Sequence, residues 1–183
     1  WVMGVNYQAV LKGIQTFLPH MVEHGEEGHV LTTVSMAGLL PGVGTYGVSK
    51  HAVMALTEAL SRDLITRQTK INASVLCPGF VDTNIDKSER NRPSHLGDAR
   101  ETTNEIGAEI MSAMLRQGKK PDEIAEIVLE AIKKNIFYIL SHPAWDDSLR
   151  SHFDNILSRK EILPNSEEEM AKFFSPRQDG EKY

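Results

Sequence analysis

The first part of the chain alternates between helical and strand-like hydrophobic spacing. Apolar residues recur every three or four positions over residues 1–21 and again over 46–67, which predicts two long amphipathic helices. Residues 29–35 and 71–76 are short runs of β-branched and apolar side chains, which predicts buried strands. Helix and strand in this repeating order indicate an α/β fold with a parallel sheet and crossover helices.

The second part continues the pattern less regularly. Helical spacing returns over residues 104–116, 121–134 and 146–158, and residues 137–140 predict a third short strand. The polar stretch 82–103 carries a run of charges that is typical of a solvated loop. Because sheets usually have about five or six strands, the pattern predicts a doubly wound, Rossmann-like parallel sheet that is incomplete at its N-terminal side.

We expect a single folded domain followed by a tail. Residues 1–158 would form the C-terminal part of a Rossmann-like domain, and residues 159–183 are charged and poorly periodic, which predicts a loosely held end. The chain opens at Trp1 inside a predicted helix, with no initiator Met and no signal-peptide pattern. We therefore expect that a further segment precedes it.

The composition excludes several classes of protein and partner. With 40% hydrophobic and 25% charged residues, the chain is not collagen-like, disulfide-rich or wholly disordered. A net charge of −5 disfavours nucleic acid as a partner. Cys77 is the single cysteine, which predicts no disulfide and no cysteine metal site, and fits a cytoplasmic setting. The apolar runs are too short to span a membrane, and the histidines lack metal-ligand spacing.

Tyr46 and Lys50 are the first candidates for chemistry. They lie four positions apart at the start of a predicted helix, so their side chains share one face. A phenol has a pKa of about 10, whereas an acid or base that works at neutral pH titrates nearer 7. A neighbouring ammonium supplies a field that stabilises the phenolate. The same spacing also arises when an aromatic residue and a cation merely share a solvated helix face.

Ser35 adds a hydroxyl where a parallel sheet binds ligands. It ends the predicted strand 29–35, and ligands bind outside the carboxyl ends of such strands. A hydroxyl there can hydrogen-bond to a substrate oxygen, although a turn or a helix cap also uses serine at such a place.

Three motifs together resemble a known family, the short-chain dehydrogenases/reductases. The segment from Ser35 to Lys50 (SMAGLLPGVGTYGVSK) resembles the family's serine, tyrosine and lysine segment. Residues 78–83 (PGFVDT) resemble its Pro-Gly-x-Val-x-Thr motif, and Asn6 follows Val5 on the helix that carries the family's Val-Asn pair. The loop between Ser35 and Tyr46 is slightly shorter than usual, which its glycines would permit.

The resemblance implies a hydride-transferring oxidoreductase that uses NAD or NADP on a carbonyl or alcohol substrate. Tyr46 would be the general acid/base, Lys50 would lower the pKa of Tyr46 and hold the nicotinamide ribose, and Ser35 would orient the substrate. Asn6 would hold a water that connects Lys50 to solvent. The nicotinamide would be bordered by residues after the second strand, with backbone groups of Val81 meeting its carboxamide: Pro78, Gly79, Val81 and Thr83.

The resemblance also raises expectations beyond the active site. The helices over 1–21 and 46–67 resemble those that pair subunits in the family, which implies a homodimer or homotetramer. Residues 82–118 would cover the substrate, and an apolar stripe there indicates either an apolar ligand or core packing. The family's glycine-rich pyrophosphate loop does not occur in the sequence, so we expect the intact protein, and not residues 1–183 alone, to bind the cofactor.

Two other readings remain. A serine hydrolase would need a base such as His51 near Ser35, but Ser35 lacks the glycine-flanked nucleophile elbow. A family member that binds a cofactor or partner without turnover is the second. It would not need a phenol beside an ammonium, so Tyr46 and Lys50 argue against it.

Overall fold

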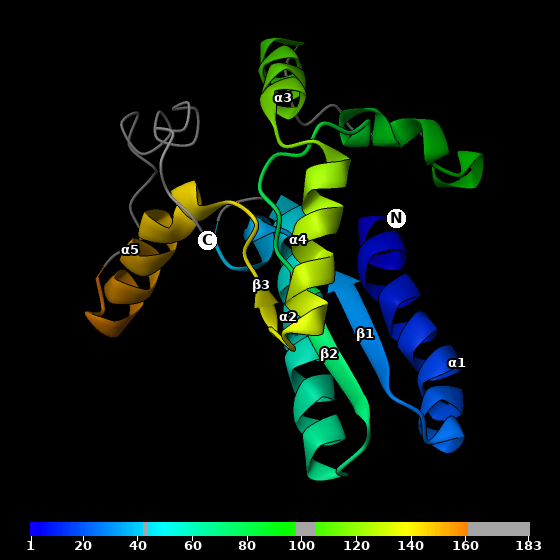
Figure 1. The fold of residues 1–183 in the computed structure, drawn as a ribbon. Helices are drawn as coiled ribbons and strands as arrows, with labels where there is room; N and C mark the ends of the chain where they lie inside the picture. The colour runs from blue at the N-terminus through cyan, green and yellow to red at the C-terminus, as the bar shows by residue number, and fades with distance from the viewer. Residues whose placement is uncertain (42–43, 98–104, 161–183) are drawn as a thin grey trace. The chain divides into compact units, whose positions relative to one another are not determined.

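The computed structural model describes residues 1–41, 44–97 and 105–160, which belong to two compact units that divide after Ser141. The first unit contains the sheet, helices α1 to α4 and every candidate site residue (Figure 1). The second unit begins with a short 3₁₀-helix, Pro143–Trp145, followed by helix α5, Asp146–Leu157. Most of the predicted tail lies outside the described residues, so the tail remains a prediction.

The strands of the first unit form a parallel sheet, as predicted. Strands β1 (Gly28–Thr33), β2 (Ile71–Leu76) and β3 (Tyr138–Ile139) lie in the order β1-β2-β3. Pairing between the first two continues past the strand ends, because the Val34 N–H donates to the Leu76 carbonyl at 2.8 Å. The chain segments after β1 and β2 are therefore held side by side at the carboxyl edge of the sheet.

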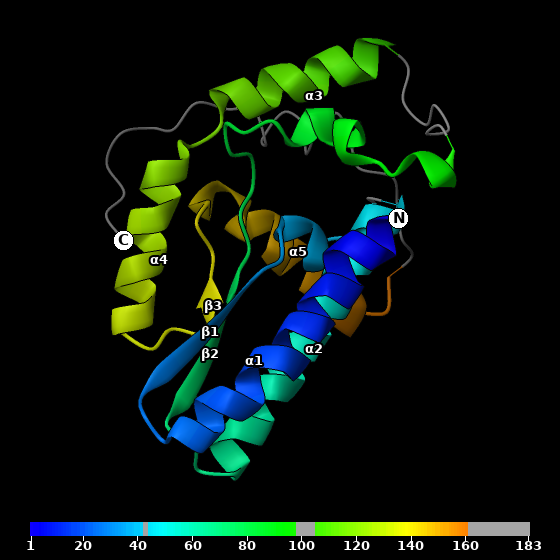
Figure 2. The same cartoon turned by 90° about the vertical axis from the view of Figure 1, so that its right-hand side faces the viewer.

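Helices cover both faces of this sheet, which confirms the doubly wound arrangement. Helices α1 (Ala9–His24) and α2 (Gly44–Thr66) lie on one side and α4 (Pro121–Lys133) on the other (Figure 2). A π-helical turn, Gly4–Gln8, precedes α1. Helix α3, Glu105–Gln117, follows two 3₁₀-helices, Ile85–Asn91 and Ser94–Leu96.

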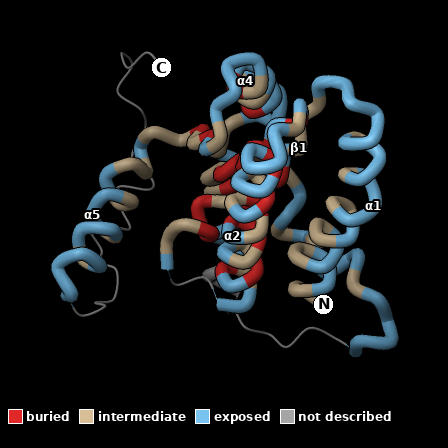
Figure 3. The backbone as a smooth tube through the Cα atoms, turned by 90° about the horizontal axis from the view of Figure 1, so that it is seen from below, coloured by how far each residue is buried: buried red, intermediate tan, exposed pale blue. Residues whose placement is uncertain are grey.

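Side chains along β2 point alternately to the two faces of the sheet, so they contribute to two separate core clusters. Ile71 and Ala73 pack with Leu60 and Leu64 of α2 and with partly buried residues of α1. Leu76, whose side chain points to the opposite face, packs against α4 in a second cluster. Each leucine or isoleucine side chain among them contributes roughly 1.5–3 kcal/mol when fully buried. The buried positions gather along α2 and the neighbouring strands (Figure 3).

Two predictions about local structure need correction. The strand at 29–35 is only partly buried, because the side chain of Leu31 is 36% exposed and Thr33 is exposed on a strand that pairs, among the described residues, with β2 alone. Part of the polar stretch 82–103 forms 3₁₀-helices instead of loop, since main-chain turns satisfy its backbone. On α3, Leu115 is buried and Met111 is 44% exposed, so core packing accounts for Leu115 alone of these two residues of the apolar stripe.

Candidate active site

The candidate site lies where α2 begins beside the carboxyl ends of β1 and β2. A 3₁₀-turn, Met36–Gly38, follows Ser35 and leads toward the start of α2. Gly38 is buried and permits the close approach of this turn to α2, because a Cβ there would lie 2.3 Å from Val34 Cγ1 and 3.0 Å from the Lys50 carbonyl oxygen. The contact places the first turns of α2 against the end of β1.

Tyr46 and Lys50 share one face of α2, as their spacing predicts. The Lys50 ammonium lies 5.6 Å from the centre of the Tyr46 ring. It donates a hydrogen bond to the Thr33 carbonyl at 2.9 Å. Both side chains are partly buried. The lysine is therefore held between the end of β1 and the phenol.

Ser35 joins this pair. Its hydroxyl forms a side-chain hydrogen bond with Tyr46 that acts to lower the pKa of the phenol. The same oxygen accepts from the Ala37 N–H at 3.2 Å and lies 3.4 Å from the Pro78 carbonyl. The three residues predicted to act on the substrate are thus brought together, and the shorter loop between Ser35 and Tyr46 does not separate them.

Burial sets the direction of both pKa shifts. It raises the pKa of Tyr46, an effect that the hydrogen bond from Ser35 partly offsets. It also lowers the pKa of Lys50, because a partly buried ammonium loses hydration. Burial and the Ser35 hydrogen bond account for the shift of the Tyr46 pKa, and the lowering expected from Lys50 stays a prediction. The ammonium donates to the Thr33 carbonyl.

Asn6 reaches the site through a residue that the sequence analysis missed. The Asn6 side-chain amide donates to the Ser49 hydroxyl at 3.0 Å, and that hydroxyl donates to the Tyr46 carbonyl at 2.6 Å. Ser49 is fully buried, and this short chain of bonds connects the turn before α1 to the backbone of the general-acid candidate. A small polar residue between Tyr46 and Lys50 on a helix was the available signal.

The single cysteine, Cys77, is close enough to Lys50 to be affected by its charge. Its thiol is fully buried, and burial raises its pKa to about 12. The charge of Lys50 acts on it in the opposite direction. At neutral pH the thiol is therefore uncharged, and Cys77 fills space in the core without ionic chemistry of its own.

The segment after β2 presents an unpaired stretch of backbone at Val81. Val81 pairs with Lys119 in a parallel bridge, in which the Lys119 N–H donates to the Phe80 carbonyl at 3.1 Å and the Asp82 N–H donates to the Lys119 carbonyl at 2.9 Å. In such a bridge the N–H and C=O of Val81 itself point away from Lys119. Within the described part of the chain, no hydrogen bond reaches either group.

Neither a Ser35–His51 pair nor a metal-binding cluster occurs among the residues that the structure describes. The His51 ring contacts the Gly47 carbonyl of its own helix at 3.0 Å, so it is not paired with Ser35. Over residues 1–41, 44–97 and 105–160, no group of three or more His, Cys, Asp or Glu side chains could hold a metal ion. No helix among them is long and apolar enough to cross a membrane.

Comparison with known proteins identifies the family. Residues 1–94 match the short chain dehydrogenase family model, and the chain belongs to this family. It is 30% identical over 86% of its length to a CLA biosynthesis dehydrogenase/reductase of Lactiplantibacillus plantarum, of which it covers 58%. It is likewise 30% identical over 86% of its length to a C alpha-dehydrogenase of Sphingobium sp., of which it covers 52%.

A solved structure shows the same fold. A short chain dehydrogenase/reductase of Burkholderia phymatum in complex with NAD superposes with a TM-score of 0.85 and 37% identity. The match covers 91% of this chain and 61% of that one. The chain therefore spans between about half and three-fifths of the length of these relatives.

Proposed function

We propose that this chain provides the proton-transfer part of an oxidoreductase that moves hydride between NAD or NADP and a carbonyl or alcohol. The observation that carries the proposal is the convergence of the Tyr46 phenol, the Lys50 ammonium and the Ser35 hydroxyl at the carboxyl edge of the sheet. The named relatives are dehydrogenases or reductases, and the solved relative from Burkholderia phymatum holds NAD.

The nicotinamide end of a cofactor fits the residues present. The carboxamide of nicotinamide carries one acceptor and one donor group, and the free N–H and C=O of Val81 complement both. Pro78 and Gly79 on one side and Thr83 on the other would border the ring, and Tyr46 and Lys50 would contact the ribose. The bound cofactor would supply or accept the hydride.

The proton would move through Tyr46. The Ser35 hydroxyl would hold the substrate oxygen, and the Tyr46 phenol would donate its proton as that oxygen gains negative charge. Because burial raises the pKa of Tyr46, the phenol is neutral at pH 7, which is the form that protonates a carbonyl during reduction. Lys50 would stabilise the phenolate that remains.

Asn6 and Ser49 would hold the catalytic turn in place. Their chain of hydrogen bonds ends on the Tyr46 carbonyl and leaves the phenol free to face the substrate. The sequence-based role of Asn6, a water-mediated link from Lys50 to solvent, remains part of the proposal.

The proposal is tested by following NADH and NADPH oxidation by the full-length protein over a panel of ketones and aldehydes. We expect at least one carbonyl to be reduced with one of the two cofactors. Cofactor binding without reduction of any panel member would instead favour the alternative, a family member that binds without turnover. Failure to bind either cofactor would overturn both.

We also propose a cytoplasmic homodimer or homotetramer that pairs through α1 and α2. Large apolar side chains on this helical region are exposed in the single chain: 54% for Val5, 66% for Phe17, 61% for Val48 and 71% for Ile65. Such surface is costly to leave in water. Light scattering of the full-length protein should give two or four subunits, and a monomer would contradict this part of the proposal.

A further inference from the structure

An ionic clamp fastens the segment after β2 to the turn between α3 and α4. The clamp consists of Asp82, Arg116 and Lys120. One carboxylate oxygen of Asp82 accepts from Arg116 at 3.0 Å, and the other accepts from Lys120 at 2.7 Å. Arg116 also lies 3.8 Å from the carboxylate of Asp86. Four charges from three segments of the chain therefore meet at this point.

The backbone beneath the clamp is packed too closely to shift freely. Gly118 lies against the main chain of residue 80: a Cβ on Gly118 would lie 2.4 Å from the Phe80 carbonyl oxygen and 2.9 Å from the Val81 nitrogen. Only glycine permits the pairing of Val81 with Lys119 at this distance. Clamp and glycine together hold the Val81 backbone in one orientation.

The orientation matters because the N–H and C=O of Val81 can face either toward the α3–α4 turn or away from it. In the observed pairing, residues on either side of Val81 bond to Lys119, and the groups of Val81 face the opposite side. A slip of the pairing by one residue would reverse this and turn those groups toward the α3–α4 turn. The clamp opposes such a slip, since it fixes the side chain of the adjacent residue, Asp82.

We propose that the clamp is a positioning device that aims the Val81 backbone at the carboxamide of the nicotinamide ring and ties the position of α3 to cofactor binding. Arg116 belongs to the last turn of α3 and Lys120 precedes α4, so both helices are attached to the segment that would meet the cofactor. The inference rests on the proposed function, because it assigns the clamp to the same cofactor site.

The test compares two ligands that differ only in the nicotinamide group, which is the group that the Val81 backbone would bind. NADH carries nicotinamide, whereas ADP-ribose carries the same adenine, ribose and diphosphate groups without it. If the protein prefers NADPH, the pair becomes NADPH and 2′-phospho-ADP-ribose. Calorimetric titration of the full-length protein measures both dissociation constants.

Arg116→Gln should weaken NADH binding about threefold to tenfold and leave ADP-ribose binding unchanged, because only the nicotinamide contact is disturbed. Arg116→Lys, which keeps one charge-assisted contact to Asp82, should recover part of the loss. The matched control is Arg67→Gln, which removes an arginine–aspartate pair of 2.9 Å at the end of α2 and should change neither constant.

Gly118→Ala tests the same inference without removing a charge. The added methyl group must push the backbone of residues 80–81 away, so the preference for NADH over ADP-ribose should fall at least tenfold. The circular dichroism spectrum of the variant should match that of wild type, which shows that the fold is kept. The clamp would be overturned if a variant lost affinity for NADH and ADP-ribose equally, or if neither Arg116→Gln nor Gly118→Ala lost affinity for NADH. Both outcomes would leave the proposed function standing. Wild-type protein that binds no NADH or NADPH would remove the proposed function itself.

Discussion

Replacement of Tyr46 by phenylalanine is expected to lower the rate of carbonyl reduction about 10²–10⁴-fold, the range over which a positioned general acid contributes. The substitution removes the phenolic oxygen and the proton that it would donate. The ring remains to fill the same partly buried space. The rate of NAD(P)H oxidation at saturating carbonyl, measured with the full-length protein, reports the loss.

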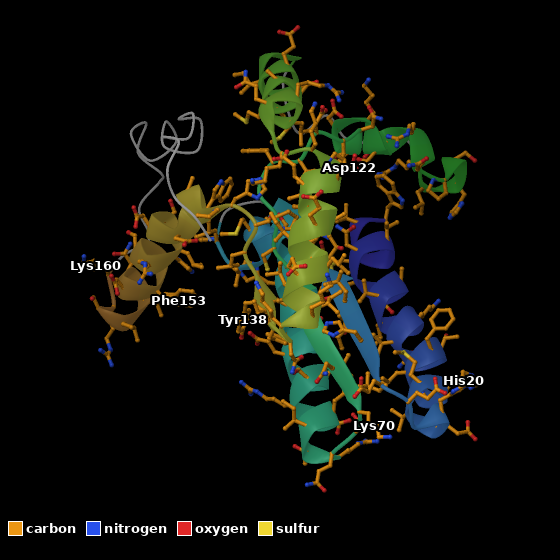
Figure 4. All side chains as sticks on the ribbon, viewed as in Figure 1. His20, Lys70, Asp122, Tyr138, Phe153 and Lys160 are labelled. Atoms are coloured by element: carbon orange, nitrogen blue, oxygen red, sulfur yellow. The ribbon has the colours of Figure 1, made fainter. Side chains whose placement is uncertain are left out.

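The fold and the cofactor site should survive this substitution. The chain of bonds from Asn6 through Ser49 ends on the Tyr46 main chain and not on its phenol, so it persists in Tyr46→Phe. Tyr138→Phe is the matched control: this tyrosine belongs to β3 (Figure 4), and its hydroxyl donates to Glu58 at 2.7 Å. Full activity in Tyr46→Phe, or an equal loss in Tyr138→Phe, would remove Tyr46 from its proposed role.

Replacement of Lys50 by methionine is expected to separate activity from stability. The rate should fall at least about a hundredfold, since a preorganised charge beside the reacting oxygen is lost. The free energy of unfolding at pH 7 should stay within about 1 kcal/mol of wild type or rise, because a partly buried ammonium is costly. Methionine retains the packing of the lysine stem, and the loss of the Thr33 hydrogen bond offsets part of the gain.

The difference in free energy of unfolding between Lys50→Met and wild type should depend on pH. Burial lowers the pKa of Lys50 in the folded chain. The folded state therefore favours the neutral amine. As far as Lys50 is concerned, the wild-type protein is most stable at high pH, where the amine is neutral, and loses this stability as the pH falls through the lowered pKa. The advantage of Lys50→Met should be largest at neutral pH and should shrink as the pH approaches about 10.4. Denaturant unfolding at several pH values measures it, with Lys133→Met on α4 as the exposed control.

A rise in Lys50→Met activity, or a fall of more than about 2 kcal/mol in its stability, would contradict this account. The first result would deny the lysine a role in the reaction. The second would make it a structural residue, so that its loss of activity would say nothing about chemistry.

Local periodicity explains why much of the arrangement could be predicted from the sequence. The spacing of Tyr46 and Lys50 fixes a shared helix face wherever the helix lies, and a parallel sheet brings the ends of successive strands to one edge. Ser35 follows the first of these strands and Pro78 the second, and the structure places the Ser35 hydroxyl 3.4 Å from the Pro78 carbonyl.

Contacts between distant segments could not be predicted in this way. Asp82 and Arg116 are 34 positions apart, and each looks like an ordinary surface charge in the sequence. The pKa of Tyr46 likewise depends on how deeply the phenol is buried, which no spacing encodes, and burial raises this pKa more than the hydrogen bond with Ser35 lowers it. The exposed face of β1 was missed for the same reason, since a strand's composition does not say what packs against it.

The buried thiol near the lysine has a practical consequence for labelling experiments. Burial raises the pKa of Cys77 to about 12, so the thiol is protonated at pH 7, and the residue has no exposed surface. Maleimide dyes and spin labels should therefore leave it unmodified. A cysteine introduced on the surface of these 183 residues would be the one that reacts, so fluorescent probes could be attached to α3 without first removing the native cysteine.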